Sequence, residues 1–170
     1  EELKAKAEAG IGPWKNGEEE YRVMWDGIAC WPHLSDTYKT LKKYGINMVT
    51  STYPESWNVR YETDDLDGMA RAYASNYANR NLDYDTQNMQ KLVEDFSVEG
   101  MIYHSNRSCK LMDFRQYEVQ RRVAAATCVP SVVFDGDQTD PRTFSEAQYE
   151  TRIQALVEMM EKNKEAQRRG

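Results

Sequence analysis

Short apolar segments that alternate with helical patterns constrain the fold of this 170-residue chain more than any other feature. Four such segments, at residues 20–25, 46–50, 101–104 and 131–134, predict strands. Amphipathic patterns between the strands predict helices, and this alternation is typical of a parallel sheet covered on both faces. We therefore expect an α/β fold, with a flavodoxin- or Rossmann-like parallel sheet of about four strands in the order 2-1-3-4 and helices on both faces.

Capping residues predict where the helices begin, and the spacing of apolar residues predicts which face of each helix is buried. Ser35 or Asp36 can begin the helix before the second strand, and Thr143 with Glu146 forms a capping box for the last helix. The expected inward residues of two further helices are Leu66, Met69, Ala70, Tyr73 and Tyr77 in the first, and Leu111, Phe114, Val119 and Val123 in the second.

Residues 1–19 form a charged helix followed by a Gly- and Pro-containing loop, and we interpret them as a linker. Residues 20–170 then form one α/β domain, because about 150 residues suffice for a single core. The chain begins with Glu1 rather than Met, so we expect it to be a piece of a longer protein.

Composition excludes several classes of protein. With 22 basic and 28 acidic residues, the net charge of −6 argues against a general nucleic-acid binder, which needs clustered Lys and Arg. No segment approaches the roughly 20 apolar residues of a membrane span. Three cysteines, Cys30, Cys109 and Cys128, make an odd number that fits a reducing, cytoplasmic compartment.

Ligands of open α/β sheets bind beyond the carboxyl ends of the strands, at the point where the strand order reverses. For the order 2-1-3-4, residues 27–34 and 105–109 lie there, with residues 135–142 alongside. Cys109 follows the third strand and opens a helix, whose free amides favour a thiolate, as do Arg107 and Lys110. The alternative is a free cysteine that packs as a small apolar side chain.

The other polar residues of these loops leave two interpretations open. His104 can carry a proton or be a hydrogen-bonded structural residue. Cys30 with His33 has the spacing of a two-ligand pair, which is too few ligands for zinc. Asp137 can pair with Arg142 or with a ligand, whereas Asp140 stands where an EF-hand requires glycine. Cys128, at the opposite end of the sheet, is interpreted as structural.

Several motifs, in order along nearly the whole chain, resemble those of the 2-hydroxyacyl-CoA dehydratases, a family that includes benzoyl-CoA reductase subunits. The motifs are HSNRSCK at residues 104–110, YEVQRR at 117–122, FDGDQxDPR at 134–142, AQxETR at 147–152, GIxCWP at 27–32, YP at 53–54 and DLDGMA at 65–70. Within the family, the likeness points to the carboxy-terminal part of a beta subunit of the 2-hydroxyglutaryl-CoA dehydratase type.

The resemblance implies a bacterial, oxygen-sensitive enzyme that converts an (R)-2-hydroxyacyl-CoA into the 2-enoyl-CoA through a ketyl radical. It implies a [4Fe–4S] cluster held by three cysteines of the full-length subunit, of which Cys109 matches the third. The surroundings of the cluster would include His104, Ser105, Asn106, Arg107, Ser108 and Lys110, together with Cys30, Asp137 and Gln138. The two cysteines expected earlier in the subunit have no counterpart here, so we expect the isolated chain to be inactive.

The resemblance also implies partners: the alpha subunit, an ATP-hydrolysing iron–sulfur activator that supplies the electron, and the acyl-CoA. In this interpretation the beta subunit relays the electron. Two alternatives stay open: a non-catalytic domain for subunit assembly, and a flavin-binding module suggested by the sheet order and the aromatic residues 53–61.

Overall fold

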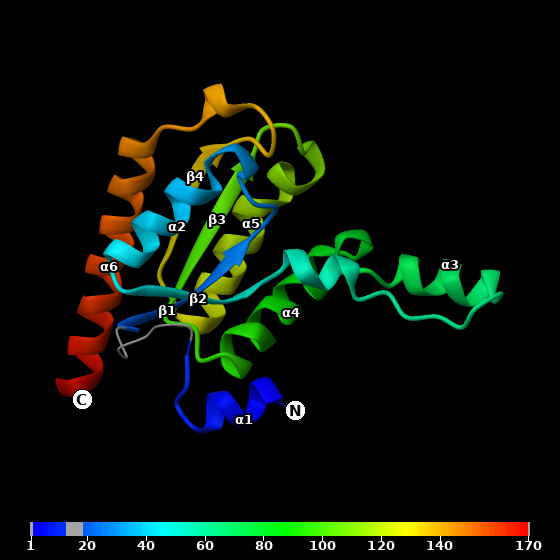
Figure 1. The fold of residues 1–170 in the computed structure, drawn as a ribbon, viewed down its shortest axis with the longest axis horizontal. Coiled ribbons are helices and arrows are strands. Elements are labelled where there is room, and N and C mark those ends of the chain that lie inside the picture. The colour runs from blue at the N-terminus through cyan, green and yellow to red at the C-terminus, as the bar shows by residue number, and fades with distance from the viewer. Residues whose placement is uncertain (1, 13–18, 170) are drawn as a thin grey trace.

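A computed structural model describes residues 2–12 and 19–169 of the chain (Figure 1). Its centre is a parallel sheet of four strands, β1 (Tyr21–Asp26), β2 (Ile46–Ser51), β3 (Gly100–Asn106) and β4 (Ser131–Gly136). The strands lie in the order β2-β1-β3-β4, which confirms the predicted order. All three strand pairs are parallel, so the four carboxyl ends share one edge of the sheet.

The helices are α1 (Glu2–Glu8), α2 (Leu34–Lys43), α3 (Leu66–Ala74), α4 (Leu82–Asp95), α5 (Lys110–Thr127) and α6 (Glu146–Arg169). Short 3-10 turns connect them: η1 (Trp31–His33), η2 (Tyr53–Trp57), η3 (Tyr77–Asn79) and η4 (Pro141–Thr143). Helices α2 and α6 lie against one face of the sheet, and α4 and α5 lie against the other (Figure 1). Within the described residues, no helix has the length and apolarity needed to cross a membrane.

Alternation along the strands creates one core on each face of the sheet. Val23 and Trp25 of β1 point to the core that α2 and α6 cover, whereas Met24 points to the core beneath α4 and α5. Because successive strand residues face opposite sides, a strand buried on both faces contains a continuous apolar run. This explains why four short apolar segments were enough to predict the sheet.

Two predicted helix starts are wrong. Helix α2 begins at Leu34, directly after the turn η1, so Ser35 and Asp36 lie inside the helix and do not cap it. At α6, Ser145 takes the position expected of Thr143, since its hydroxyl oxygen accepts from the amide of Gln148 at 3.5 Å. The Thr143 hydroxyl instead donates to the Asp140 carbonyl in the preceding turn, at 3.1 Å.

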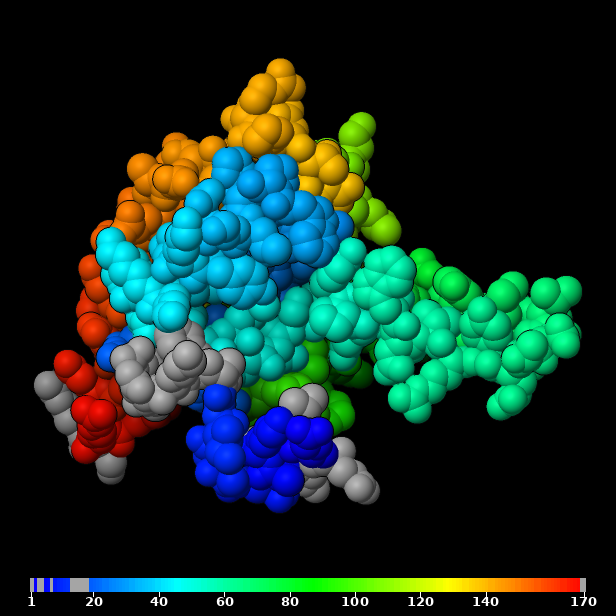
Figure 2. All heavy atoms as spheres, viewed as in Figure 1, coloured from blue at the N-terminus to red at the C-terminus, as the bar shows by residue number. Residues whose placement is uncertain are grey.

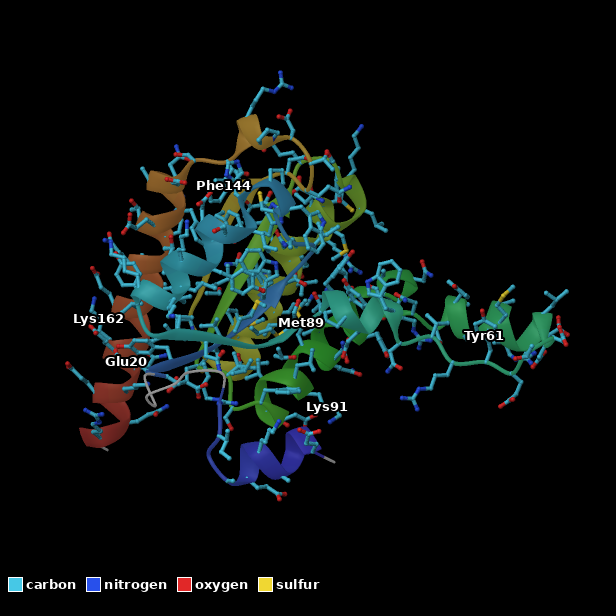
Figure 3. The ribbon with its side chains drawn as sticks, in the orientation of Figure 1. Glu20, Tyr61, Met89, Lys91, Phe144 and Lys162 are labelled. Atoms are coloured by element: carbon cyan, nitrogen blue, oxygen red, sulfur yellow. The ribbon has the colours of Figure 1, made fainter. Side chains whose placement is uncertain are left out.

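Helix α3 forms but ends at Ala74, so Tyr77, expected on its inward face, lies instead in the turn η3, where it is buried. The apolar face of the helix itself is not part of either core. Leu66 and Tyr73 are 74% and 54% exposed, and residues 58–75 extend away from the sheet as a projecting arm (Figures 1 and 2). Tyr61 lies on this arm, far from Met89, which belongs to the core beneath α4 (Figure 3). The amphipathic pattern correctly predicted a helix, but it did not show whether this chain covers the apolar face.

Helix α5 has the predicted bounds but not the predicted inward face. Val119 and Val123 are buried, whereas Leu111 and Phe114 are 63% and 91% exposed, which contradicts their assignment to the core. Tyr117 continues this stripe one turn further and is also exposed. In the first two turns of α5 the one buried residue is the polar Gln116.

Candidate functional site

The loops that follow β3 and β4 are joined by hydrogen bonds at the carboxyl edge of the sheet. The side-chain amide of Asn106 donates to the Gln138 Oε1 at 3.0 Å, and the Gln138 backbone amide donates back to the Asn106 Oδ1 at 3.2 Å. The amide of Arg107 donates to the carbonyl of Gly136 at 3.1 Å, which extends the strand pairing into the loops. The structure thus brings together residues that are about 30 positions apart in the sequence.

Asp137 holds the second of these loops in place. Its carboxylate is buried, and it accepts from the Ser108 hydroxyl and from the amides of Thr139 and Asp140 at 2.8 and 3.0 Å. The hydroxyl and the two amides hold the pKa of the Asp137 carboxyl well below its usual range. Asp137 is therefore a fixed anion, and Arg142 pairs with Asp140 instead of with it.

Cys109 is half-buried at the beginning of α5. Its amide donates to the Asn106 carbonyl at 2.8 Å, so the hydrogen-bonded turn fixes the position of its backbone. Within the described residues, its side chain does not cap the helix. Among its neighbours, Arg107 lies 3.7 Å from the Asp135 carboxylate, and Lys110 is exposed. Cys109 thus directly precedes the first residue of a helix, and its cationic sequence neighbours are Arg107, which pairs with Asp135, and the exposed Lys110.

Cys30 and His104 lie deeper, beneath the turn. The Cys30 thiol is buried and donates to the Asp137 carbonyl at 3.2 Å, and burial raises the pKa of this thiol. His104 is also buried, and its Nδ1 lies 2.6 Å from the Ile28 carbonyl, which places the proton on Nδ1. Burial lowers the pKa of His104, so both side chains are neutral near pH 7.

Two glycines allow the strand ends to close around His104. Gly27 has a φ of +94°, and a Cβ built there would lie 3.2 Å from the His104 carbonyl oxygen. A Cβ on Gly136 would lie 2.6 Å from His104 Nε2, which is closer than real Cβ atoms approach. On its other face the imidazole stacks on Phe134, with ring centroids 4.9 Å apart. The histidine is thus an immobile part of the floor of the site.

The remaining predicted site residue, Ser105, is buried, and its hydroxyl donates to the Asp113 carboxylate in the first turn of α5. It therefore supports the start of the helix from below. Of the predicted residues, Asn106, Ser108, Asp137 and Gln138 form the joined loops, Cys30 and His104 form the floor, and Cys109, Arg107 and Lys110 face outward.

Sequence reasoning missed Asp26, the last residue of β1. Its buried carboxylate accepts from the Thr52 hydroxyl at 2.8 Å and from the Gln116 side-chain amide at 3.1 Å. The same Gln116 nitrogen also donates to the His104 carbonyl at 3.1 Å, which connects β1, β3 and α5. Burial raises the pKa of Asp26. The available signal was a carboxylate at the end of an apolar strand segment.

A buried ion pair lies beside this network and was also missed. Arg115 of α5 pairs with Asp85 of α4, and its guanidinium carbon lies 5.6 Å from the centre of the Tyr77 ring. Burial raises the pKa of Asp85 to about 6, although Arg115 opposes this rise. The pair fixes α4 to α5 on the face opposite α2 and α6.

No group of three or more His, Cys, Asp or Glu side chains arranged to hold a metal ion occurs among residues 2–12 and 19–169. The chain's fold and site thus define an α/β domain whose ligand edge carries a single accessible thiol on a rigid turn. The chain belongs to the 2-hydroxyglutaryl-CoA dehydratase D-component family, whose model matches residues 1–160.

Curated relatives carry names from the same class of enzyme. The chain is 49% identical over 168 residues to the (R)-2-hydroxyisocaproyl-CoA dehydratase alpha subunit of Clostridioides difficile, covering 99% of this chain and 41% of that protein. It is 44% identical over 165 residues to the lactoyl-CoA dehydratase subunit alpha of Anaerotignum propionicum, covering 96% and 39%. It is 39% identical over 148 residues to the (R)-2-hydroxyglutaryl-CoA dehydratase subunit alpha of Acidaminococcus fermentans, covering 87% and 31%.

These matches confirm the family and give no support to the expected beta subunit, because the three relatives are alpha subunits. The chain spans about two fifths of the length of the first two relatives and less of the third.

Proposed function

We propose that this chain is part of an alpha-type subunit of a 2-hydroxyacyl-CoA dehydratase, in which Cys109 supplies one ligand of a [4Fe–4S] cluster. The accessible position of Cys109 at the ligand edge carries this proposal. Cys30 is buried and engaged with the Asp137 carbonyl, and Cys128 lies at the other end of α5. The names of the relatives favour an alpha subunit over the beta subunit that the motifs alone suggested.

The described residues offer one thiolate ligand for such a cluster. Iron–sulfur clusters take thiolate ligands, and Cys109 offers one beside the free amides at the start of an 18-residue helix. The other ligands would come from residues beyond those described, since no metal-binding group of three side chains is found among them. When bound, the cluster would supply the one-electron chemistry for removing water from the 2-hydroxyacyl thioester.

The surrounding residues would hold the thiol and exclude water from beneath it. Asn106 and Ser108 connect its turn to the loop that Asp137 fixes, so Cys109 cannot move without breaking several hydrogen bonds. Cys30 and His104 form a neutral floor, which adds no charge under the ligand. Arg107 and Lys110 supply positive charge near an anionic centre.

A Cys109→Ser variant of the complete enzyme, with its partner subunit and activator present, tests the proposal. We expect cluster iron and dehydration activity to be lost, because a hydroxyl is a poor ligand for iron in such clusters. Cys128→Ser is the matched control, since Cys128 is exposed at the opposite end of α5 and its loss should change neither quantity. Normal iron content and turnover in Cys109→Ser would overturn the proposal.

The partners follow from the same proposal. They are a second dehydratase subunit, an ATP-hydrolysing iron–sulfur activator and an acyl-CoA substrate, all in the cytoplasm. The isolated chain should not give a four-iron spectrum after treatment with iron and sulfide, because it offers one ligand. A stable four-iron spectrum from the isolated chain would contradict this ligand count.

One observation favours a second candidate function, a domain for subunit assembly. Leu111, Phe114 and Tyr117 form an exposed apolar stripe next to Cys109, and such stripes commonly mark contacts with other chains. In that case Cys109→Ser would leave iron and turnover unchanged. The third candidate, a flavin-binding module, predicts that the purified protein absorbs visible light as bound flavins do.

A further inference from the structure

A small apolar pocket of about 210 Å³ opens at the carboxyl ends of β1 and β2, away from the Cys109 turn. Trp25, Leu41 and Met48 form its inner wall, contributed by β1, α2 and β2. Trp31, Tyr38 and Tyr53 surround its mouth. The pocket is therefore built from three elements of the sheet edge and is not a gap within one loop.

The wall of the pocket presents mainly apolar groups to a ligand. Among the described residues, none that lines it is charged. Two polar side chains of its wall have partners inside the protein, the first being Thr37, whose hydroxyl donates to the carbonyls of His33 and Leu34 at 3.1 and 2.9 Å. The indole nitrogen of Trp25 likewise faces the Ile28 carbonyl at 3.5 Å. The interior of the pocket therefore offers mainly apolar contact surface, and the polar side-chain groups of Trp31, Tyr38 and Tyr53 belong to its mouth.

The aromatic side chains at the mouth are unusually exposed. Trp31 is 48% exposed and Tyr38 is 47% exposed, although both lie beside an apolar hollow. Trp31 and Tyr53 meet edge to face, with ring centroids 6.2 Å apart. Exposed aromatic residues around an apolar pocket are typical of sites that bury an apolar ligand.

The volume limits what this ligand can be. An apolar cavity of roughly 150 Å³ holds one benzene molecule. About 210 Å³ therefore accommodates one phenyl ring or a branched chain of similar size. A carboxylate held between Trp25, Leu41 and Met48 would be buried without a cation to pair with it, since no charged residue lines the pocket among the described residues, and this is strongly unfavourable.

The pocket opens at the same edge of the sheet as the proposed cluster ligand. Gly27, in the pocket wall, packs against the carbonyl of His104, and Cys109 lies in the loop that follows the same strand as His104. A thioester bound near Cys109 can therefore extend its acyl side chain along the edge of the sheet toward β2.

We infer that this pocket binds the acyl side chain of the substrate and selects branched or aromatic apolar side chains over those that end in a carboxylate. The inference rests on the proposed dehydratase function and makes it more specific. It predicts that the complete enzyme prefers 2-hydroxyisocaproyl-CoA or phenyllactyl-CoA to 2-hydroxyglutaryl-CoA.

The test is Ala29→Phe in the complete enzyme, because Ala29 lines the pocket and a phenyl group there would fill much of it. We expect kcat/KM for 2-hydroxyisocaproyl-CoA to fall by roughly 10- to 200-fold, the usual effect of losing one or two methylene contacts. Lactoyl-CoA, whose side chain is a methyl group, should change by less than about threefold on the same reasoning. Ala125→Phe, at an exposed position of α5, is the matched control and should change neither value.

A second measurement separates binding from turnover. Isocaproyl-CoA and propionyl-CoA have no 2-hydroxyl group to lose, so calorimetry can compare their affinities directly. Ala29→Phe should selectively weaken the binding of isocaproyl-CoA. If this variant does not fold, Ala29→Val replaces it and should weaken the same binding to a smaller extent. Equal losses of affinity for both thioesters would overturn the inference. Unchanged affinities for both would also overturn it, because they would show that another part of the subunit already fills the pocket.

The two proposals fail in different ways. A wild-type enzyme that prefers 2-hydroxyglutaryl-CoA would overturn the pocket inference and leave the dehydratase function intact. A wild-type enzyme that dehydrates no 2-hydroxyacyl-CoA would overturn the proposed function, and selective weakening of isocaproyl-CoA by Ala29→Phe would still support the pocket as an apolar binding site.

Discussion

Replacing Arg115 with methionine removes the cation that contacts Asp85 in the interface between α4 and α5. The Asp85 side chain is 1% exposed and that of Arg115 is 13% exposed, so water cannot replace the lost contact. Methionine keeps much of the apolar stem of arginine, which limits the loss of packing against Tyr77. The main effect should therefore be electrostatic, and it should depend on pH.

The magnitude follows from the protonation of Asp85. With Arg115 present, its pKa in the folded protein is about 6, compared with an ordinary value of 3.8. Without Arg115 this pKa rises further, so between pH 6 and pH 8 the folded variant retains a proton that the unfolded chain has lost. Stability then falls as pH rises, by about 1.4 kcal/mol per pH unit, or roughly 3 kcal/mol over this range. The wild-type carboxyl ionises near pH 6 and shows little of this slope above it.

Urea unfolding followed by circular dichroism at pH 6 and pH 8 measures the difference. We expect Arg115→Met to lose much more stability at pH 8 than at pH 6, whereas the double variant with Asp85→Asn should recover most of it. A slope that remains in the double variant would come from Asp26, whose buried carboxyl also senses Arg115. A loss of equal size at both pH values would refute the assignment of the effect to Asp85.

Two further predictions concern the floor and the loops of the site. Gly136→Ala places a Cβ against the Nε2 of the stacked His104 ring. Thermal unfolding should therefore show that the free energy of unfolding falls by about 1–3 kcal/mol. An unchanged melting temperature would contradict this packing. Ser108→Ala removes the hydroxyl that contributes most to the lowered pKa of Asp137, so an NMR titration of that carboxyl should show a higher pKa. A lowered carboxyl pKa stabilises the fold above about pH 4, and this contribution is lost as pH falls. Ser108→Ala should therefore lose less stability on acidification than the wild-type protein. Identical profiles of stability against pH for the two proteins would count against this role of Ser108.

The sheet was predictable because its signal is local. Each strand is an apolar run of about six residues that ends at a glycine or a polar residue, and helices separate the runs. The predicted strand bounds differ from the observed ones by one or two residues. The fourth strand, for example, was predicted to end at residue 134, whereas β4 extends to Gly136. The apolar faces of α3 and of the first turns of α5 were assigned incorrectly, since spacing shows that a face exists and not which chain covers it.

The site was predictable in position but not in its connections. Residues 104–110 and 135–142 stand out because each follows a strand at the edge where ligands bind. The contacts between Asn106 and Gln138 depend on the register that places Asn106 opposite Gly136, which no local pattern encodes. Asp26 and Gln116 meet only when α5 packs on β1 and β3, so their partnership appears only in the folded chain.

The strand order also divides the ligand edge into two modules. Strands β1 and β2 are consecutive in the sequence and build the apolar pocket, and β3 and β4 are consecutive and build the turn that carries Cys109. The two modules meet where β1 pairs with β3, through Asp26, Gly27 and His104. Ile28 and Cys30 also bond across this boundary, to His104 and Asp137. Under the proposed function, residues of α2, β2 and η2 could therefore change the selected acyl side chain without touching the hydrogen bonds that hold the Cys109 turn. If the proposed function holds, such a division would let related dehydratases acquire new substrates by a few substitutions in these three elements.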